Sequence, residues 1–388
     1  MDNTLRTSIL VVVLALIGGS IYYFESQKVK PNISMPESTQ ADIAPRVVDA
    51  DMLPPAPGEG KPATAPAGIK KSEMYGLAKE IASPSGFVNT KPFRIQDLIG
   101  KKVILVDFWT YSCINCQRTQ PYLNAWYDKY HDQGLEIVGV HTPEFGFEKI
   151  LANVEKASRD ANIKYPVVLD NDYATWNAYK NRFWPRKYLI DIDGYIIYDH
   201  IGEGGYAETE KKIQTALSER MVVLNERGSV AGGTVTPSAD TPSFNQQMSR
   251  ETYFGAWRNT NFGNGTPSTE GEKTFAVPDA KNIDAEKFYL DGAWQIAREY
   301  AKNTEKGARL VFRFRAKDVH MVAGAPNGAK IRILQDGKPV SGGDVKNGEL
   351  QIHDSKRYHL IENSSFGEHV LEIYIEDAGL EAFTFTFG

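Results

Sequence analysis

Cysteine is scarce in this sequence, and neither sign of charge is in large excess. The chain of 388 residues has only two cysteines, which excludes a framework of several structural disulfides. Its formal net charge of −5 does not provide the basic surface that binds nucleic acid. Two cysteines supply half of a tetrahedral metal site, and no second C-x-x-C or H-x-x-x-H pattern supplies the rest. We therefore expect neither nucleic acid nor a structural metal as a ligand.

Long apolar runs are also scarce. Residues 8–24 form an uncharged run close to the length of a membrane span, and the aromatic residues at its end are typical of a bilayer interface. We expect residues 1–24 to be an uncleaved signal anchor that crosses the membrane once, and a cleaved signal peptide is the alternative. Residues 25–79 are rich in proline and alanine, which predicts an extended tether.

The two cysteines are spaced C-x-x-C at Cys113 and Cys116, after the apolar run Val103–Trp109. The run predicts a buried strand, and the segment that follows predicts a helix from Cys113 to about Tyr130. Unpaired N–H groups and the dipole at a helix N-terminus favour a thiolate. Cys113 is therefore the predicted nucleophile and Cys116 the predicted resolving thiol. We expect a redox-active disulfide between them and no other cofactor, and two buried, unreactive cysteines are the alternative.

A carboxylate interrupts the apolar run six residues before the first cysteine. Asp107 is costly to bury unless it is paired or has a function. We predict that it accepts the proton of Cys116 when this thiol resolves a mixed disulfide. The alternative is a structural ion pair between Asp107 and Lys101 or Lys102.

Pro185 and His141 stand at the predicted ends of strands. A cis peptide bond before Pro185 would place a backbone edge beside the disulfide for an extended substrate, and a strand-initiating proline is the alternative. His141 is predicted to line the site or to change the acidity of the thiols, and a loop histidine is the alternative. We also expect several neighbours of the dithiol to lie close to the substrate, namely Trp109, Ser112, Ile114, Asn115 and Trp184.

Residues 80–222 alternate between strand and helix patterns. An Asp193-Gly194 pair between apolar runs predicts a hairpin, and Asp172 is the predicted cap of a short helix that ends at Tyr179. This order predicts an α/β domain with a mixed central sheet and helices on both faces. The further elements expected are strands at 135–140, 167–169, 188–190 and 195–198, and helices at 147–161 and 208–220.

The sequence changes character after a second linker at 223–247. Residues 248–388 show short alternating strands and no convincing long helix, which predicts an all-β sandwich. Four aromatic residues either form a platform for a sugar or belong to the core of the sandwich: Trp257, Tyr289, Trp294 and Tyr300. The strands expected are 309–315, 330–334, 349–353, 357–361, 370–375 and 381–387.

Several of these segments together resemble the thioredoxin superfamily, and more specifically the extracytoplasmic region of DipZ-type proteins. The resemblance implies a thioredoxin-like domain followed by a β-sandwich similar to a carbohydrate-binding module. It implies that Cys113 and Cys116 are the redox pair, that Pro185 is the cis-proline and that Asp107 is the buried acid. The segments that carry the resemblance are 106–119, 139–145, 169–176, 184–185 and 188–191.

The chemistry and the resemblance together predict a thiol–disulfide oxidoreductase tethered to the cell membrane, with its catalytic domain in the periplasm or at the outer face. We expect it to reduce disulfides of exported proteins. DipZ-type proteins usually carry a multi-span domain similar to CcdA that passes electrons outward, whereas this sequence has one apolar run. We therefore expect a separate CcdA-like membrane partner as electron donor. The alternatives are a module that binds a glycan or a protein at the cell surface, with a secondary redox domain, and an oxidase that forms disulfides.

Overall fold

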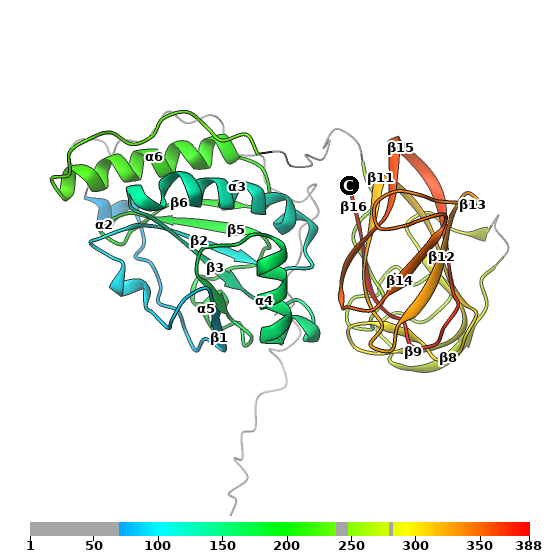
Figure 1. Cartoon of the computed structure of the whole chain (residues 1–388). Helices are drawn as coiled ribbons and strands as arrows, with labels where there is room; N and C mark the ends of the chain where they lie inside the picture. The colour runs from blue at the N-terminus through cyan, green and yellow to red at the C-terminus, as the bar shows by residue number, and fades with distance from the viewer. Residues whose placement is uncertain (1–69, 238–246, 279–281) are drawn as a thin grey trace, which may run out of the picture. The chain divides into compact units, whose positions relative to one another are not determined.

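The computed structural model describes residues 70–237, 247–278 and 282–388 (Figure 1). They form an N-terminal α/β domain and a β-rich C-terminal region, and each is described by itself. The predicted anchor, residues 1–24, lies outside the described residues. Within the described ranges, no helix is long and apolar enough to cross a membrane.

The α/β domain begins earlier than predicted. A short helix, α2 (Lys71–Met74), lies inside the segment expected to be a tether. Leu77 forms an antiparallel bridge with Tyr195, and the N–H of Ala78 donates to the carbonyl of Gly194 at 2.9 Å. The chain is therefore already packed on the domain ahead of the predicted boundary at residue 80.

A six-stranded mixed sheet forms the centre of the α/β domain, in the order β1-β4-β3-β2-β5-β6. Strands β2, β3 and β4 are parallel neighbours, whereas β1, β5 and β6 pair antiparallel. Every residue of β2 and β3 is buried, which explains their nearly continuous apolar sequence. The strands are β1 (Gly86–Val88), β2 (Val103–Trp109), β3 (Leu135–His141), β4 (Val167–Leu169), β5 (Arg186–Ile190) and β6 (Ile196–Ile201).

Helices cover both faces of this sheet, as predicted. Figure 1 shows α3 and α6 side by side on one face, where the ring of Tyr122 stacks on that of Tyr206 with centroids 3.6 Å apart. Helix α5 covers the opposite face, where Trp176 packs against Phe108 of β2. The helices are α3 (Ile114–Tyr130), α4 (Leu151–Asp160), α5 (Ala174–Ala178) and α6 (Tyr206–Val223), with short 3₁₀ turns η2 (Ile95–Asp97), η3 (His131–Gln133) and η4 (Gly146–Lys149).

Two local predictions in this domain need correction. The single helix expected at 147–161 is divided, because Ile150 has an extended backbone and separates η4 from α4. The N-cap residue of α5 is Tyr173, and the carboxylate that accepts from its first turn is that of Asp170 and not Asp172, with bonds from the N–H groups of Thr175 at 2.9 Å and Trp176 at 2.8 Å. These bonds supply the acceptors that the first turn of α5 lacks.

The C-terminal region is built of antiparallel strands, and its described residues contain no α-helix. Hydrogen bonds connect ten strands into one sheet, because β11 pairs with β9 near one end and with β16 near the other. Register shifts in β11 at residues 316–320 bend this long strand. The strands are β7 (Thr252–Tyr253), β8 (Gly271–Phe275), β9 (Phe288–Ile296), β10 (Ala301–Asn303), β11 (Ala308–Gly324), β12 (Ala329–Gln335), β13 (Lys338–Pro339), β14 (Glu349–Ile352), β15 (Lys356–Ile375) and β16 (Glu381–Phe387).

The two strands predicted at 357–361 and 370–375 are the ends of one strand, β15. The intervening segment is polar, and it was therefore not recognised as part of the strand.

The four aromatic residues do not form an open platform for a sugar. Tyr289 and Trp294 are buried, so the core interpretation is correct for them. Tyr300 packs against Phe383 with ring centroids 5.3 Å apart. Trp257 is half-buried, and the guanidinium of Arg298 lies 4.6 Å from the centre of its ring.

Candidate dithiol site

The C-x-x-C pair lies where β2 ends and α3 begins. Cys113 is the N-cap residue of α3, with extended backbone angles, and its Sγ accepts the N–H of Cys116 at 3.3 Å. Both thiols are free in this structure; Cys113 is half-exposed and Cys116 is buried. A substrate in solution can therefore reach the predicted nucleophile, whereas the predicted resolving thiol is sheltered.

Cys116 requires help to lose its proton. Burial and the adjacent Cys113 raise the pKa of the Cys116 thiol well above its ordinary value, and the charge of Asp107 raises it further. A backbone hydrogen bond at Thr110 acts in the opposite direction. The thiol is therefore protonated at neutral pH, and a nearby base has to accept its proton when it reacts.

Asp107 is suited to be that base. It lies in the middle of β2, its side chain is buried, and its Oδ1 has no hydrogen-bond partner among the described residues. Burial raises the pKa of Asp107 to about 7, although the charge of Lys187 lowers it. A carboxyl group that titrates near neutral pH is present in both forms under physiological conditions, which a proton acceptor requires.

Lys187 is the cation beside Asp107, and the sequence interpretation did not identify it. The two residues are direct partners in the antiparallel pairing of β2 with β5. Lys187 is fully buried, and burial lowers its pKa, while the charges of Asp107 and Cys116 raise it. The predicted partners are wrong: Lys101 donates to the carbonyl of Asp97 at 2.9 Å, and Lys102 donates to that of His131 at 3.4 Å.

On the other side of Asp107, its partner in β3 is Gly139. A Cβ atom at Gly139 would lie 2.9 Å from Nε1 of Trp109 and 3.1 Å from the ring of Tyr165. The missing side chain thus admits two aromatic rings to this part of the sheet. The hydroxyl of Tyr165 accepts from the amide of Gln120 on α3. Trp109, predicted to be near the substrate, is mostly buried.

His141 lies beside the turn that leads to the dithiol. Its ring stacks on Tyr111 with centroids 5.6 Å apart, and its Nε2 lies 3.4 Å from Oγ1 of Thr110. Burial lowers the pKa of His141 to about 3, so its imidazole is neutral near pH 7. His141 ends β3 and packs on the turn before the dithiol, and its predicted part in lining the site or changing the acidity of the thiols stays a prediction.

The remaining predicted residues differ in their exposure to solvent. The peptide bond between Trp184 and Pro185 is cis, as the sequence interpretation proposed. Trp184 is buried against Trp176, with ring centroids 4.5 Å apart. Ser112 is buried before Cys113, whereas Ile114 and Asn115 are half-exposed. Ile114 and Asn115 are thus the neighbours of Cys113 that a substrate can contact.

A second buried carboxylate, Glu148, was also missed. It follows β3 in η4, and it accepts hydrogen bonds from the backbone N–H of Ser112 at 3.2 Å and from the hydroxyl of Ser112 at 2.7 Å. Nothing in its local sequence indicates this contact, because the two residues are 36 positions apart.

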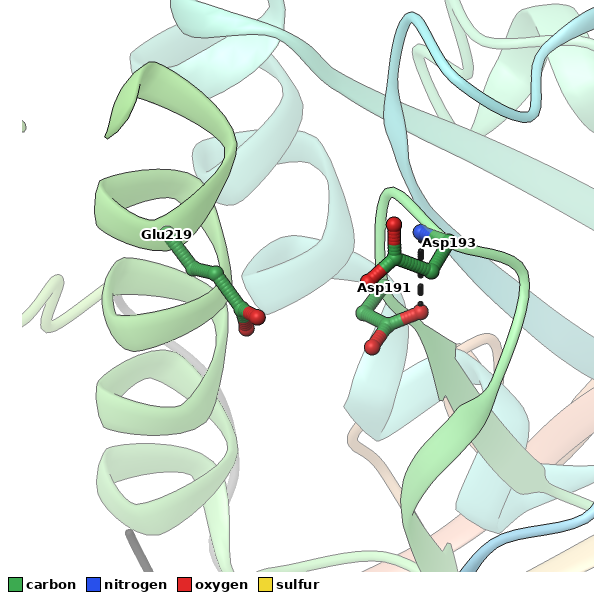
Figure 2. A group of neighbouring side chains, drawn as sticks. All are labelled: Asp191, Asp193 and Glu219. Atoms are coloured by element: carbon green, nitrogen blue, oxygen red, sulfur yellow. Dashed lines mark hydrogen bonds between the residues drawn. The ribbon is translucent and has the colours of Figure 1, made fainter. Parts of the chain in front are cut away.

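A group of three carboxylates lies away from the dithiol, at the β5–β6 hairpin and α6 (Figure 2). Figure 2 shows Asp191, Asp193 and Glu219 turned toward a common space. The ammonium of Lys71 binds Asp191 and Asp193 at 2.8 Å each and also binds Glu219. Burial lowers the pKa of Lys71, but the bonds to the three carboxylates raise this pKa by more, so the net shift is upward. The lysine supplies the counter-charge, and the carboxylates fasten α2 to the domain.

Comparisons with known proteins agree with this geometry. Residues 77–217 match the sequence model of the Redoxin family, and residues 249–388 match the one described as "Thioredoxin like C-terminal domain". Thiol-disulfide oxidoreductase YkuV of Bacillus subtilis (strain 168) is 31% identical over 140 residues, which cover 36% of this chain and 93% of that protein. Thiol-disulfide oxidoreductase ResA of Bacillus cereus is 31% identical over 124 residues, covering 32% of this chain and 68% of that protein.

A longer match covers most of the chain. Protein DipZ of Mycobacterium tuberculosis (strain CDC 1551 / Oshkosh) is 36% identical over 327 residues. The match covers 83% of this chain and 44% of DipZ, so the chain spans less than half the length of that relative.

Proposed function

Because the chain belongs to the family of thioredoxin-like thiol–disulfide oxidoreductases, we propose that it reduces disulfides of exported proteins while tethered to a membrane through residues 8–24. One observation carries the chemistry. A half-exposed thiol, Cys113, stands in front of a buried thiol, Cys116, whose neighbours are the carboxylate of Asp107 and the ammonium of Lys187. This arrangement separates the attacking thiol from the resolving thiol and supplies a base to the latter.

The reaction takes place in two exchange steps. The thiolate of Cys113 attacks one sulfur of the substrate disulfide, and the other substrate sulfur leaves with the bonding electron pair and takes up a proton. Cys116 then attacks Sγ of Cys113, which forms the Cys113–Cys116 disulfide and releases the second substrate thiol. The substrate gains two electrons and two protons, and the dithiol loses them.

Asp107 acts in the second step. The buried Cys116 thiol has a raised pKa, whereas Asp107 titrates at about 7 and is ionised in a large share of molecules at neutral pH. The carboxylate accepts the proton as Cys116 attacks. Lys187 offsets the negative charge that Asp107 carries before the transfer.

Substitution of each cysteine tests the assignment. We expect Cys113→Ser to abolish the reduction of a protein disulfide such as those of insulin. Cys116→Ser keeps the nucleophile and loses the resolving thiol, so it accumulates mixed disulfides that mass spectrometry detects. Reduction that persists in Cys113→Ser, or a Cys116→Ser variant that forms no mixed disulfide, would contradict the proposal.

The direction of electron flow is part of the proposal and has its own measurement. Equilibration of the Cys113–Cys116 couple with glutathione gives its reduction potential. A value near about −270 mV supports a reductase, and a value near about −120 mV supports an oxidase that forms disulfides.

The location and the electron donor are further parts of the proposal. The apolar run at residues 8–24 and the similarity to DipZ over 83% of the chain support a single-pass protein with its dithiol outside the cytoplasm. We expect the full chain to stay in the membrane fraction after an alkaline wash and to be released when residues 2–24 are deleted. A CcdA-like membrane partner would keep Cys113 reduced, which an alkylation assay in cells with and without such a partner measures. A glycan ligand of residues 248–388 stays a prediction without support from the aromatic residues.

A further inference from the structure

Glu148 is a fully buried carboxylate that binds four hydrogen-bond donors. One oxygen, Oε1, accepts from the N–H of Ser112 at 3.2 Å and from its hydroxyl at 2.7 Å. The other oxygen, Oε2, accepts from the N–H groups of Glu144 at 2.6 Å and Phe145 at 3.0 Å. Four donors around one carboxylate favour its ionised form, because a protonated oxygen would lose an acceptor site.

The bonds of Glu148 connect two segments that are distant in the sequence. Oε2 binds the loop that follows β3, where Glu148 completes the cap of η4. A purely local capping role would use these bonds alone. Oε1, however, binds Ser112, the residue immediately before Cys113 and in the turn that ends β2. Glu148 therefore holds the backbone of Ser112, the residue that directly precedes the nucleophile Cys113 and the start of α3.

The groups that change the pKa of Glu148 are hydroxyls, a backbone N–H and a second carboxylate. Burial raises the pKa of Glu148 to about 7; the hydroxyls of Thr110 and Ser112 lower it, and the charge of Glu144 raises it. The phenols of Tyr111 and Tyr173 also face this charge, which contributes to their raised pKa values. At pH 8 the carboxylate is mostly ionised, and its negative charge is held one residue from Cys113.

We propose that Glu148 is a positioning residue of the dithiol site, which holds Ser112 in place and sets a negative charge beside the turn that leads to the dithiol, where it favours the disulfide over the reduced form. The inference rests on dithiol exchange at Cys113 and Cys116. A charge that destabilises the thiolate stabilises the disulfide relative to the reduced form. The carboxylate thus makes the couple a stronger reductant.

The test is the reduction potential of Glu148→Gln in the full chain, measured at pH 8 against glutathione. Glutamine retains the size of the side chain and removes the charge. We expect the equilibrium constant to change by about tenfold toward the reduced form, which is a potential about 30 mV less negative. Glu155→Gln is the matched control, because it makes the same chemical change at a half-exposed position of α4 and is expected to leave the potential unchanged.

Lower thermal stability of Glu148→Gln with an unchanged or more negative potential would overturn the inference, because Glu148 would then be only a cap of η4. If that variant does not fold, Ser112→Ala provides the test. It removes the hydroxyl donor alone, so Glu148 is less ionised, and we expect a change of about twofold in the same direction, about 9 mV. An unchanged potential in Ser112→Ala would also overturn the inference. A wild-type chain without a reversible dithiol–disulfide couple would instead refute the proposed function.

Discussion

Replacing Asp107 by asparagine is expected to stabilise the protein more at pH 8 than at pH 5. The folded-state pKa of Asp107 is raised from 3.8 to about 7 by burial. The folded protein therefore binds this proton more tightly than the unfolded chain, and the wild-type stability falls as the pH rises from about 4 to 7. Asparagine cannot ionise and escapes this loss.

The size of the effect follows from the interval between the two pH values. From pH 5 to pH 7 the unfolded carboxyl group is ionised while the folded one is largely protonated, and each pH unit costs about 1.4 kcal/mol. The advantage of Asp107→Asn over the wild type thus grows by about 2–3 kcal/mol between pH 5 and pH 8. Lys187 loses its counter-charge in the variant, but a buried lysine deprotonates more easily at pH 8, so this does not reverse the sign.

Urea denaturation of the oxidised protein at both pH values measures this difference. The oxidised form removes the titration of the two thiols from the comparison. Asp132→Asn is the control, because Asp132 is exposed and its replacement is expected to leave the pH dependence of the wild type unchanged. If Asp107→Asn and the wild type differ in free energy of unfolding by the same amount at pH 5 and pH 8, the carboxylate does not titrate as inferred.

Three further substitutions test individual contacts. Lys187→Met removes the charge that lowers the pKa of Asp107, so the pH dependence of the resolving step, followed by the release of a substrate thiol, moves to higher pH; an unchanged profile would refute the coupling. Gly139→Ala places a Cβ against Trp109 and Tyr165, and we expect a loss of about 1–3 kcal/mol in urea denaturation. Asp170→Ala removes the cap of α5 and costs about 1 kcal/mol, whereas Asp172→Ala changes stability by less than about 0.5 kcal/mol; equal effects in thermal unfolding would contradict the assignment of the cap.

Sequence patterns predicted the parts of the fold that depend on local signals. The apolar run Val103–Trp109 is β2 with the predicted bounds, and the C-x-x-C pair opens α3. The Asp193-Gly194 turn joins β5 to β6. In each case the residues that determine the structure are adjacent in the chain, so the local sequence pattern is sufficient to predict the buried strand or the turn.

Predictions failed where the partner of a residue comes from a distant segment. The sequence predicts that a lysine close to Asp107 in the chain is its ion-pair partner, whereas the pairing of β2 with β5 places Lys187 beside it. Asp172 was chosen as a cap for its position before α5, yet Tyr173 adopts a left-handed backbone with φ of 59°, and Asp170 lies under the first turn instead. Strand register and the path of a loop determine such contacts, and neither is encoded in the residues on either side.

The two buried carboxylates bear on the direction of electron flow, which the C-x-x-C pair alone leaves open. The charge of Asp107 raises the pKa of Cys116, and Glu148 holds a second negative charge next to Cys113 through Ser112. The charge of Asp107 disfavours the thiolate of Cys116 and so favours the disulfide product of the exchange, and the effect proposed for Glu148 has the same sign. The positive charge of Lys187 opposes the effect of the carboxylates. Burial lowers the pKa of Lys187, however, and Lys187 is the strand partner of Asp107. The balance of charge around the dithiol therefore supports a site that donates electrons to its substrate.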